Sequence, residues 1–353
     1  MYSISAADAV SPAIQRTREF LFRPFNWGTF LKLGLVALIT EGFGSNFNSS
    51  SHGGGGGSPS HGPVINSPLS SYLGGFYLIA GIAALVLAAI LAAWLFYLFT
   101  RLRFAFFHCL VENTKQIRPG WQLYKTQATR FFWMNIAVGF CFLMAMVVIA
   151  LPFVAGFVKL FHGTPPGGHP DWGLMLALAL PLIPIILLLM LAGLVTDLIL
   201  RDFMMPHYAL ENATAGAAWG EVWSNIKAEK GQFFVYAILR VILPILAAIG
   251  LFIVLLIPGA VLAGALGMVE YGIHTGFAGA TGASTAAGIF LEVFFGVVAF
   301  GFALLLSICL GGPLSTGIRE YALIFYGGRY PTLGDKLFPV RPAASVGGNA
   351  SVV

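Results

Sequence analysis

The chain has 353 residues, of which 9% are charged and 58% are hydrophobic, and its formal net charge at pH 7 is +5. Soluble domains carry about 25% charged residues, so this composition excludes an ordinary water-soluble fold and indicates a membrane protein. The basic residues do not form a stripe, and the positive net charge therefore does not indicate nucleic-acid binding.

Six apolar segments are candidates for membrane-spanning helices, because about 20 apolar residues cross the hydrocarbon core of a bilayer. The first is short and the other five are longer. The segments are residues 27–43, 72–100, 131–161, 172–200, 233–268 and 286–310. The last ends at Gly311-Gly312-Pro313, and the prolines at 181, 184, 244 and 258 are candidate kinks. The sequence therefore predicts an all-α membrane protein with six transmembrane helices.

The distribution of lysine and arginine predicts the orientation. Apart from Lys32, Lys159 and Arg240, which lie inside spans, all of them flank the first and last spans or lie between spans two and three or four and five. The connections 44–68, 162–171 and 269–285 contain none. Cytoplasmic loops carry the positive charge in membrane proteins. We therefore expect both termini in the cytoplasm of a bacterium and the spans in its inner (cell) membrane.

The domain organisation is predicted to be simple. Residues 1–337 are expected to form a single transmembrane domain. The glycine- and serine-rich segment 44–68 is expected to be a flexible outer loop, and residues 338–353 a disordered cytoplasmic tail.

A motif of the form His-x-x-aliphatic-Glu-Asn occurs twice, as His108–Asn113 after span two and as His207–Asn212 after span four. Tryptophan and lysine follow each copy, and then an aromatic pair opens the next span, Phe131-Phe132 or Phe233-Phe234. The chain is therefore expected to contain three repeats of an interfacial helix plus a helical hairpin, at about 5–112, 113–211 and 212–326.

The interfacial helices are predicted from helical periodicity. Trp219, Val222, Trp223 and Ile226 share one helix face, and Ile117, Trp121 and Tyr124 repeat the pattern, as Ile14, Thr17 and Leu21 do more weakly. Trp121, Trp219 and Trp223 are expected to anchor these helices in the cytoplasmic headgroup layer. The alternative is that these helices pack on the inner face of the helix bundle.

This unit resembles a loose superfamily of bacterial multi-span membrane proteins. The superfamily includes the membrane domain found beside glycerophosphodiester phosphodiesterases. The resemblance lies in the order of elements and in the aliphatic-Glu-Asn…Trp…Phe-Phe pattern at 111–132 and 210–234. It implies a multi-span fold; the catalytic phosphodiesterase domain is expected to be absent, so the resemblance implies no catalytic residues.

Two His/Glu pairs, His108 with Glu112 and His207 with Glu211, are the candidates for a metal site. Each pair shares a helix face at i, i+4. If the repeats pack symmetrically, the four side chains converge, and their ligand types suit Zn²⁺, Fe or Mn²⁺. The favoured alternative is structural: each Glu accepts hydrogen bonds from the next helix, each Asn ends a helix, and no metal or cofactor is bound.

Four charged residues lie inside the predicted spans, namely Lys32, Asp197, Arg240 and Glu292. An intramembrane charge needs a partner or water. We expect Arg240 to point into the bundle and to pair with Asp197, although Asp197 can also pair with Arg201 on its own helix. Glu292, with Glu41 and Glu270, is a candidate for an acidic outer vestibule, against the alternative that the last two lie in the headgroup layer.

The sequence contains no catalytic motif, so a non-enzymatic multi-pass membrane protein is expected. A scaffold, an assembly factor or a lipid-organising partner fits best, with the lipid bilayer and other membrane proteins as its partners. The alternative is a transporter or channel for ions or small molecules that uses the intramembrane charges. A water-filled cavity that reaches Arg240 and Glu292 would favour transport, and dry apolar packing would favour the scaffold.

Overall fold

The computed structural model describes residues 4–43, 68–163, 172–276 and 283–338, and this part of the chain contains helices and no strand. The predicted outer loop (44–68) and tail (338–353) lie almost entirely outside the described residues. In chain order the elements are α1 (Val10–Phe22), α2 (Trp27–Ala37), η1 (Leu38–Phe43), α4 (Pro68–Val111), α5 (Ile117–Leu123), α6 (Lys125–Gly163), α7 (Trp172–Ala179), α8 (Leu182–Leu198), η2 (Ile199–Met204), α9 (Met205–Leu210), α10 (Ala215–Ala228), α11 (Lys230–Gly276), α12 (Ala283–Gly327) and α13 (Pro331–Leu337).

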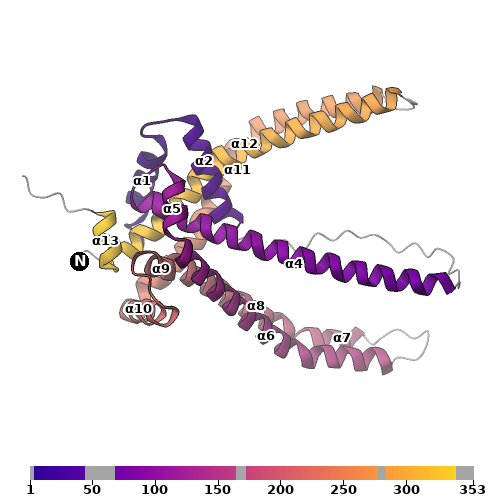
Figure 1. Cartoon of the computed structure of the whole chain (residues 1–353), viewed down its shortest axis with the longest axis horizontal. Helices are drawn as coiled ribbons and strands as arrows, with labels where there is room; N and C mark the ends of the chain where they lie inside the picture. Colours follow the sequence, from indigo (N-terminus) through magenta and orange to yellow (C-terminus); the bar gives the residue numbers. More distant parts are fainter. Residues whose placement is uncertain (1–3, 44–67, 164–171, 277–282, 339–353) are drawn as a thin grey trace, which may run out of the picture.

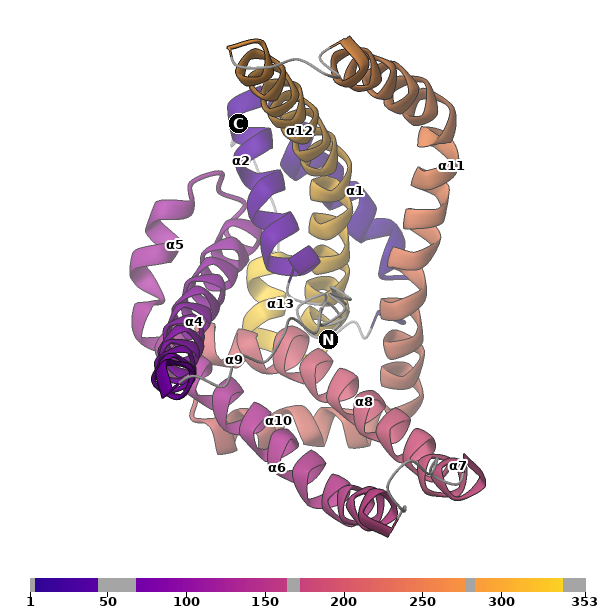
Figure 2. The ribbon, with the colours of Figure 1, turned by 90° about the vertical axis from the view of Figure 1, so that its right-hand side faces the viewer.

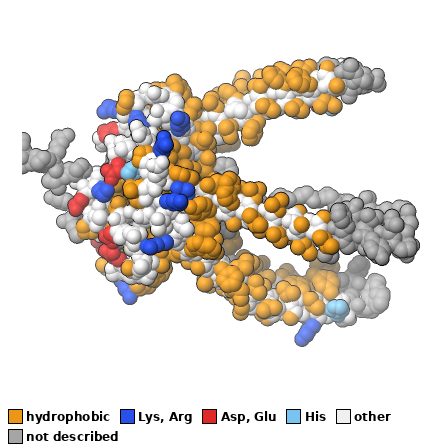
Figure 3. Space-filling view, viewed as in Figure 1, with side chains coloured by type: hydrophobic (Ala, Val, Ile, Leu, Met, Phe, Trp, Pro, Cys, Tyr) orange, Lys and Arg blue, Asp and Glu red, His pale blue; other side chains and the backbone are white. Residues whose placement is uncertain are grey.

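The helices form a compact base from which three long arms diverge (Figures 1 and 2). One arm is α4, the second is α6 with α7 and α8, and the third is α11 with α12. Helices α1, α2, α5, α9, α10 and α13 lie in the base. Charged side chains gather on the base, whereas the surface of the arms is almost entirely apolar (Figure 3).

Aromatic side chains form the core of the base, because every long helix contributes phenylalanine where it enters. Phe131 of α6 packs on Tyr208 of α9, with ring centroids 5.3 Å apart. Phe233 of α11 packs on Phe203 of η2 at 5.1 Å and on Phe325 of α12 at 5.4 Å. The first rings of the two predicted Phe-Phe pairs thus join the core. Aromatic burial of this kind contributes strongly to stability.

Five helical stretches are long and apolar enough to cross a membrane. They are Ile79–Val111, Lys125–His162, Trp172–Leu210, Lys230–Gly276 and Ala286–Gly327. The most apolar window of each of the first four is 0% buried, and that of the fifth is 6% buried. Helices that are apolar on all faces and unburied require a hydrocarbon environment. The described part of the chain is thus all-α with helices suited to cross a membrane, and five of the six predicted spans correspond to candidates.

The first predicted span, residues 27–43, is not among these candidates. It forms α2 and η1, which pack within the base against α12 and bury Phe30, Leu33 and Val36. The prediction that Glu41 lies in the outer headgroup layer is wrong. Glu41 is buried in the base, where its Oε2 lies 2.9 Å from Arg201 Nη2 of η2. The side chain of Glu270 lies outside the described residues.

The predicted helix break at Gly311-Gly312-Pro313 is also wrong, because α12 continues through it to Gly327. The glycines instead allow α2 to approach α12 closely. A Cβ atom built on Gly312 would lie 2.6 Å from the Cα atom of Gly34, and one on Gly34 would lie 3.2 Å from the Ile308 carbonyl oxygen. Of the predicted kinks, the one at Pro181 separates α7 from α8, whereas α11 continues through Pro244 and Pro258.

We expect Gly312→Ala to destabilise the protein by about 1–3 kcal/mol, because the added methyl group forces the backbones of α2 and α12 apart. Gly301→Ala on the same helix is the matched control, since a Cβ atom there meets nothing within 4 Å. The control should be neutral or slightly stabilising. Unfolding of the purified variants in detergent measures both changes, and equal unfolding free energies for the two variants would contradict the close packing.

The first and last described helices meet in the base. Arg16 of α1 donates a hydrogen bond from Nη1 to the Leu337 carbonyl of α13 at 3.0 Å, and its Nε lies 3.2 Å from Glu320 of α12. Helix α13 was not predicted from the sequence. The predicted apolar face of the first helix is correct for Thr17 and Leu21 but wrong for Ile14, which is exposed while Ala13 and Phe20 are buried.

Candidate functional site

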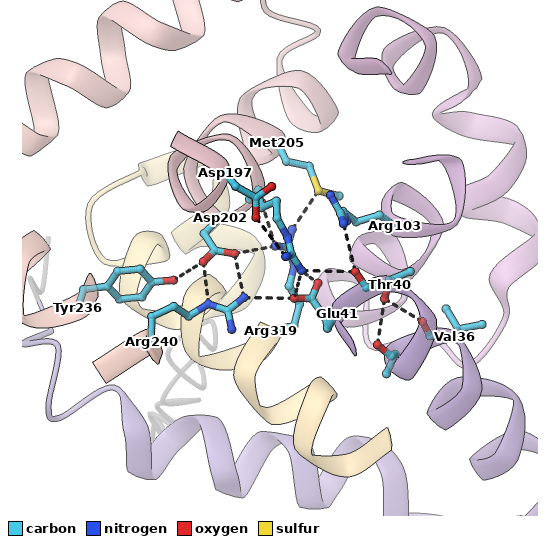
Figure 4. A network of polar contacts seen from close by, with 12 residues as sticks. Val36, Thr40, Glu41, Arg103, Asp197, Asp202, Met205, Tyr236, Arg240 and Arg319 are labelled. Carbon is cyan, nitrogen blue, oxygen red and sulfur yellow. Dashed lines mark hydrogen bonds and ion pairs between the residues drawn. The ribbon is translucent and has the colours of Figure 1, made fainter. Parts of the chain in front are cut away.

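Two π-helical turns supply the acidic side chains of a buried charge network at the centre of the base. Such turns are rare in proteins, and those that occur often lie at functional sites. Glu41 comes from η1, and Asp202 comes from η2. In η1 the Thr40 hydroxyl donates to the Val36 carbonyl at 2.8 Å, a bond that competes with the regular helix. The Thr40 carbonyl is left to accept hydrogen bonds from Arg103 at 3.2 Å and Arg201 at 3.4 Å (Figure 4).

Asp202 lies at the centre of the network and is 1% exposed. Its Oδ2 accepts hydrogen bonds from Tyr236 Oη at 2.8 Å and from Arg240 Nε at 2.8 Å. Its Oδ1 accepts from Arg319 Nη1 at 3.1 Å and from Arg240 Nη2 at 3.4 Å (Figure 4). A buried carboxylate with this set of donors has its hydrogen-bonding capacity satisfied and its charge balanced.

Glu41 is the second buried carboxylate and connects α2 and η1 to the other helices. Its Oε2 accepts from Arg201 Nη2 at 2.9 Å and from Arg240 Nη2 at 3.2 Å, and its Oε1 lies 4.0 Å from Arg319 Nε. Arg240 therefore bridges Glu41 and Asp202. The network links η1, η2, α11 and α12, so it fixes where the arms leave the base.

The arginines outnumber the carboxylates. Three guanidinium groups, of Arg201, Arg240 and Arg319, form ion pairs with Glu41, Asp202 and the half-exposed Asp197, and a fourth, of Arg103, donates to the Thr40 carbonyl beside them. Arg319, which is 1% exposed, also donates to the Arg201 carbonyl at 2.9 Å and to Met205 Sδ at 3.0 Å. Because the excess charge is positive, removal of either buried carboxylate leaves several buried cations unbalanced.

The predicted orientation of Arg240 is confirmed, but its predicted partner is wrong. Arg240 points into the base and pairs with Asp202 and Glu41. Asp197 pairs with Arg201 at 3.3 Å, the alternative that the i, i+4 spacing allows. The π-helical turn η2 begins just after Asp197, and it directs Asp202 toward α11 and α12. The sequence signal for Asp202 was its position beside Arg201, at the end of an apolar run.

The other two intramembrane charges lie apart from the network. Lys32 is exposed on α2. Glu292 lies on the distal part of α12, where its Oε1 is 3.2 Å from His274 Nδ1 of α11. A cavity of about 40 Å³ adjoins Glu292, and apolar residues of α11 and α12 line the rest of it. The structure therefore does not bring Lys32, Arg240 and Glu292 together.

The two His/Glu motifs end their helices in the same way but have different partners. Asn113 and Asn212 have φ values of 50° and 52°, so each ends a helix in the left-handed region. Glu112 Oε1 lies 2.6 Å from Lys336 Nζ, whereas Glu211 Oε1 accepts a hydrogen bond from Thr332 Oγ1 at 3.2 Å. Both glutamates thus contact α13. The structural alternative had each of them accept hydrogen bonds from the amides of the next helix, and this part of it is wrong.

The predicted convergence of both motifs into one four-residue cluster is not found among the described residues. The group that could hold a metal there is His207 with Glu211 and with Glu221 of α10. His108 instead packs edge-on against Tyr124, with ring centroids 5.7 Å apart. Glu221 was not predicted as a ligand, because it lies on the polar side of α10 and outside the two His/Glu motifs.

The predicted tryptophan anchors lie on the surface of the base. Trp219 and Trp223 are 42% and 44% exposed and stack on each other at 6.2 Å, while Val222 between them is buried. Trp121 is half-buried beneath the Arg101 guanidinium, whose carbon lies 4.3 Å from the ring centroid. All three leave an aromatic surface available to a headgroup layer.

The comparisons with known proteins identify a family whose function is unknown. The sequence model of a family described as a family of unknown function, DUF7544, matches residues 4–335. No curated protein and no solved structure matches the chain. The resemblance to the membrane domain found beside glycerophosphodiester phosphodiesterases stays a prediction.

Proposed function

We propose a scaffold function for this chain, which belongs to the DUF7544 family of unknown function. The protein would be a non-enzymatic component of a bacterial inner membrane that organises lipid or a membrane partner between its arms. The observation that carries the proposal is the combination of divergent, unburied apolar arms with a base fixed by buried ion pairs. Such arms must be covered by lipid tails or by another membrane protein.

The arms support this proposal on every face. Leu85 of α4 is 70% exposed, Leu187 of α8 is 67% exposed and Val254 of α11 is 72% exposed. The arms separate from one another as they leave the base (Figure 1). In a bilayer, lipid or partner helices would occupy the space between them. Because the network fixes the arms at the base, the arms present these surfaces in a defined arrangement.

The same geometry counts against the transporter alternative. The charges expected to line a path are distributed over separate parts of the molecule, and the residues that line the cavity at Glu292 do not include Arg240. Arg240 is balanced by the buried carboxylates of Asp202 and Glu41 rather than facing a water-filled space. A buried network in which both carboxylates are ion-paired favours a structural role.

We further propose that the base faces the cytoplasm and that the chain has six crossings and three repeats. Support for the orientation is the charge on the base and the contact between α1 and α13 within it. Support for the repeats is the left-handed backbone of both Asn113 and Asn212. The proposed first crossing is residues 27–43, whose helices α2 and η1 lie against α12.

A cysteine at position 58 should react with a membrane-impermeant thiol reagent in intact cells, and a cysteine at position 115 should not. The background would lack the native cysteines Cys109, Cys141 and Cys309. Both positions should react once the cells are opened, which controls for burial. Labelling at position 115 in intact cells would reverse the proposed orientation.

Extraction of the full chain within its native lipid tests the scaffold function. Mass spectrometry of the extracted particles should find a lipid class or a membrane protein that is enriched relative to the bulk membrane. An unrelated multi-span protein from the same membrane is the control. A composition identical to that of the control particles, with no specific protein, would contradict an organising role.

A further inference from the structure

Three potential metal ligands meet at the surface of the base, outside the buried network. His207 comes from α9, Glu211 follows α9 directly, and Glu221 comes from α10. His207 Nδ1 lies 3.6 Å from Glu211 Oε2 and 3.5 Å from Glu221 Oε2. The three ligand atoms lie within 4.8 Å of one another.

The environment of the His207 side chain favours the binding of a ligand. Its ring is 0% exposed, and its Nδ1 forms no hydrogen bond in the described part of the chain, although both carboxylates lie within ion-pair distance of it. That nitrogen faces two carboxylates whose side chains are 38% and 49% exposed. A buried polar atom without a hydrogen bond is costly, and two neighbouring carboxylates repel each other. A bound cation would relieve both.

We propose that His207 Nδ1, Glu211 and Glu221 bind a divalent transition-metal ion of the zinc type, with one further position open to water. Bonds of about 2.1 Å in a tetrahedral arrangement place ligand atoms about 3.4 Å apart. The two distances from His207 Nδ1 correspond to that spacing. Imidazole and carboxylate ligands together select Zn²⁺, Mn²⁺ or Fe²⁺ over Ca²⁺ and Mg²⁺, which prefer oxygen ligands alone.

Neighbouring residues hold the ligands in place. Tyr326 Oη lies 2.6 Å from His207 Nε2, so a proton on Nε2 would be held there and Nδ1 left free for the metal. The Tyr330 ring lies against His207 at a centroid distance of 4.1 Å. Thr332 Oγ1 donates a hydrogen bond to Glu211 Oε1 at 3.2 Å, which leaves Glu211 Oε2 directed at His207.

The preceding repeat provides an internal control, because it has the same motif without the site. Glu112 is paired with Lys336 at 2.6 Å. Helix α5, which follows that motif, contains no acidic residue at all, whereas α10 supplies Glu221. The site is thus specific to the second motif. The proposal is independent of the scaffold function, since all three ligands lie in the base and none lies in the arms.

Zinc binding to the untagged, full-length protein in detergent tests the proposal. The protein is treated with a chelator, desalted and titrated with Zn²⁺ by calorimetry, and bound metal is counted by mass spectrometry after a second desalting step. The variants are Glu211→Gln, Glu221→Gln and their combination, with Glu112→Gln as the matched control. The glutamines replace partly exposed carboxylates, and circular dichroism checks that each variant is folded.

We expect one Zn²⁺ in the wild type that the double variant loses, with at least a tenfold weaker affinity in each single variant. Glu112→Gln should bind like the wild type. Tyr326→Phe should weaken binding by about 10–100-fold, as changes next to a ligating histidine do. Equal stoichiometry and affinity in the wild type and the double variant would overturn the site. An equal loss in Glu112→Gln would overturn it as well.

Discussion

Asp202→Leu should destabilise the protein by about 3–5 kcal/mol, because removal of one partner of a buried ion pair leaves the others uncompensated. Asp202 accepts hydrogen bonds from Arg240 at 2.8 Å and Arg319 at 3.1 Å, and both guanidinium groups would remain in the base. Unfolding of the purified protein in detergent measures the loss. The expected destabilisation approaches the whole stability of a typical domain.

Asp197→Leu is the matched control for this change. Asp197 lies five residues earlier in the same apolar run, contacts Arg201 alone among the ion pairs found, and has a side chain that is 52% exposed. Its removal should cost less than about 1 kcal/mol. Arg240→Leu combined with Asp202→Leu should cost less than the sum of the two single changes, whereas Arg240→Leu with Asp197→Leu should be additive. Coupling to Asp197 instead would show that the network is wrongly assigned.

Glu41→Leu is expected to have the second large effect, also about 3–5 kcal/mol. Glu41 neutralises Arg201 at 2.9 Å and Arg240 at 3.2 Å, and it holds η1 and α2 against the bases of the arms. Hydrogen exchange should therefore increase first in Trp27–Ala37, while the distal part of α11 keeps its protection. This regional pattern distinguishes release of α2 from general unfolding.

Glu112→Leu is the control for Glu41→Leu, because Glu112 forms a single ion pair with Lys336 and both side chains are more than 40% exposed. It should cost less than about 1 kcal/mol. Equal destabilisation by the two substitutions, or unchanged exchange in α2 when Glu41 is replaced, would contradict the anchoring role of Glu41.

The long helices were predictable from the sequence, since apolar runs of spanning length fix their positions. Their ends were not, because the helices continue beyond the apolar runs into the base. Thus α4 extends to Val111, and its Phe104 and Phe107 are buried there. Helical segments inside a lipid layer and inside a protein core have similar apolar amino-acid compositions, so hydropathy does not show where the membrane ends.

The candidate site was predictable only in part. Arg240 was identified because a charge within a span needs a partner. Its partner was missed because the π-helical turns η1 and η2 change the side-chain register, and the hydropathy pattern of the sequence does not indicate such turns. Glu41 was missed because residues 27–43 read as a short span, although they pack on α12 through Gly34 and Gly312. Contacts between distant segments decided these features.

Spin-label accessibility along an arm tests the central claim, that the arms stand in lipid while the charge network is a closed anchor. Labels at successive positions from Phe252 to Ile257 of α11 cover every face of that helix. In bilayers, each label should collide readily with oxygen and rarely with a water-soluble nickel complex. A face of the helix that the nickel complex reaches, recurring with helical periodicity, would reveal a water-lined path and contradict the scaffold.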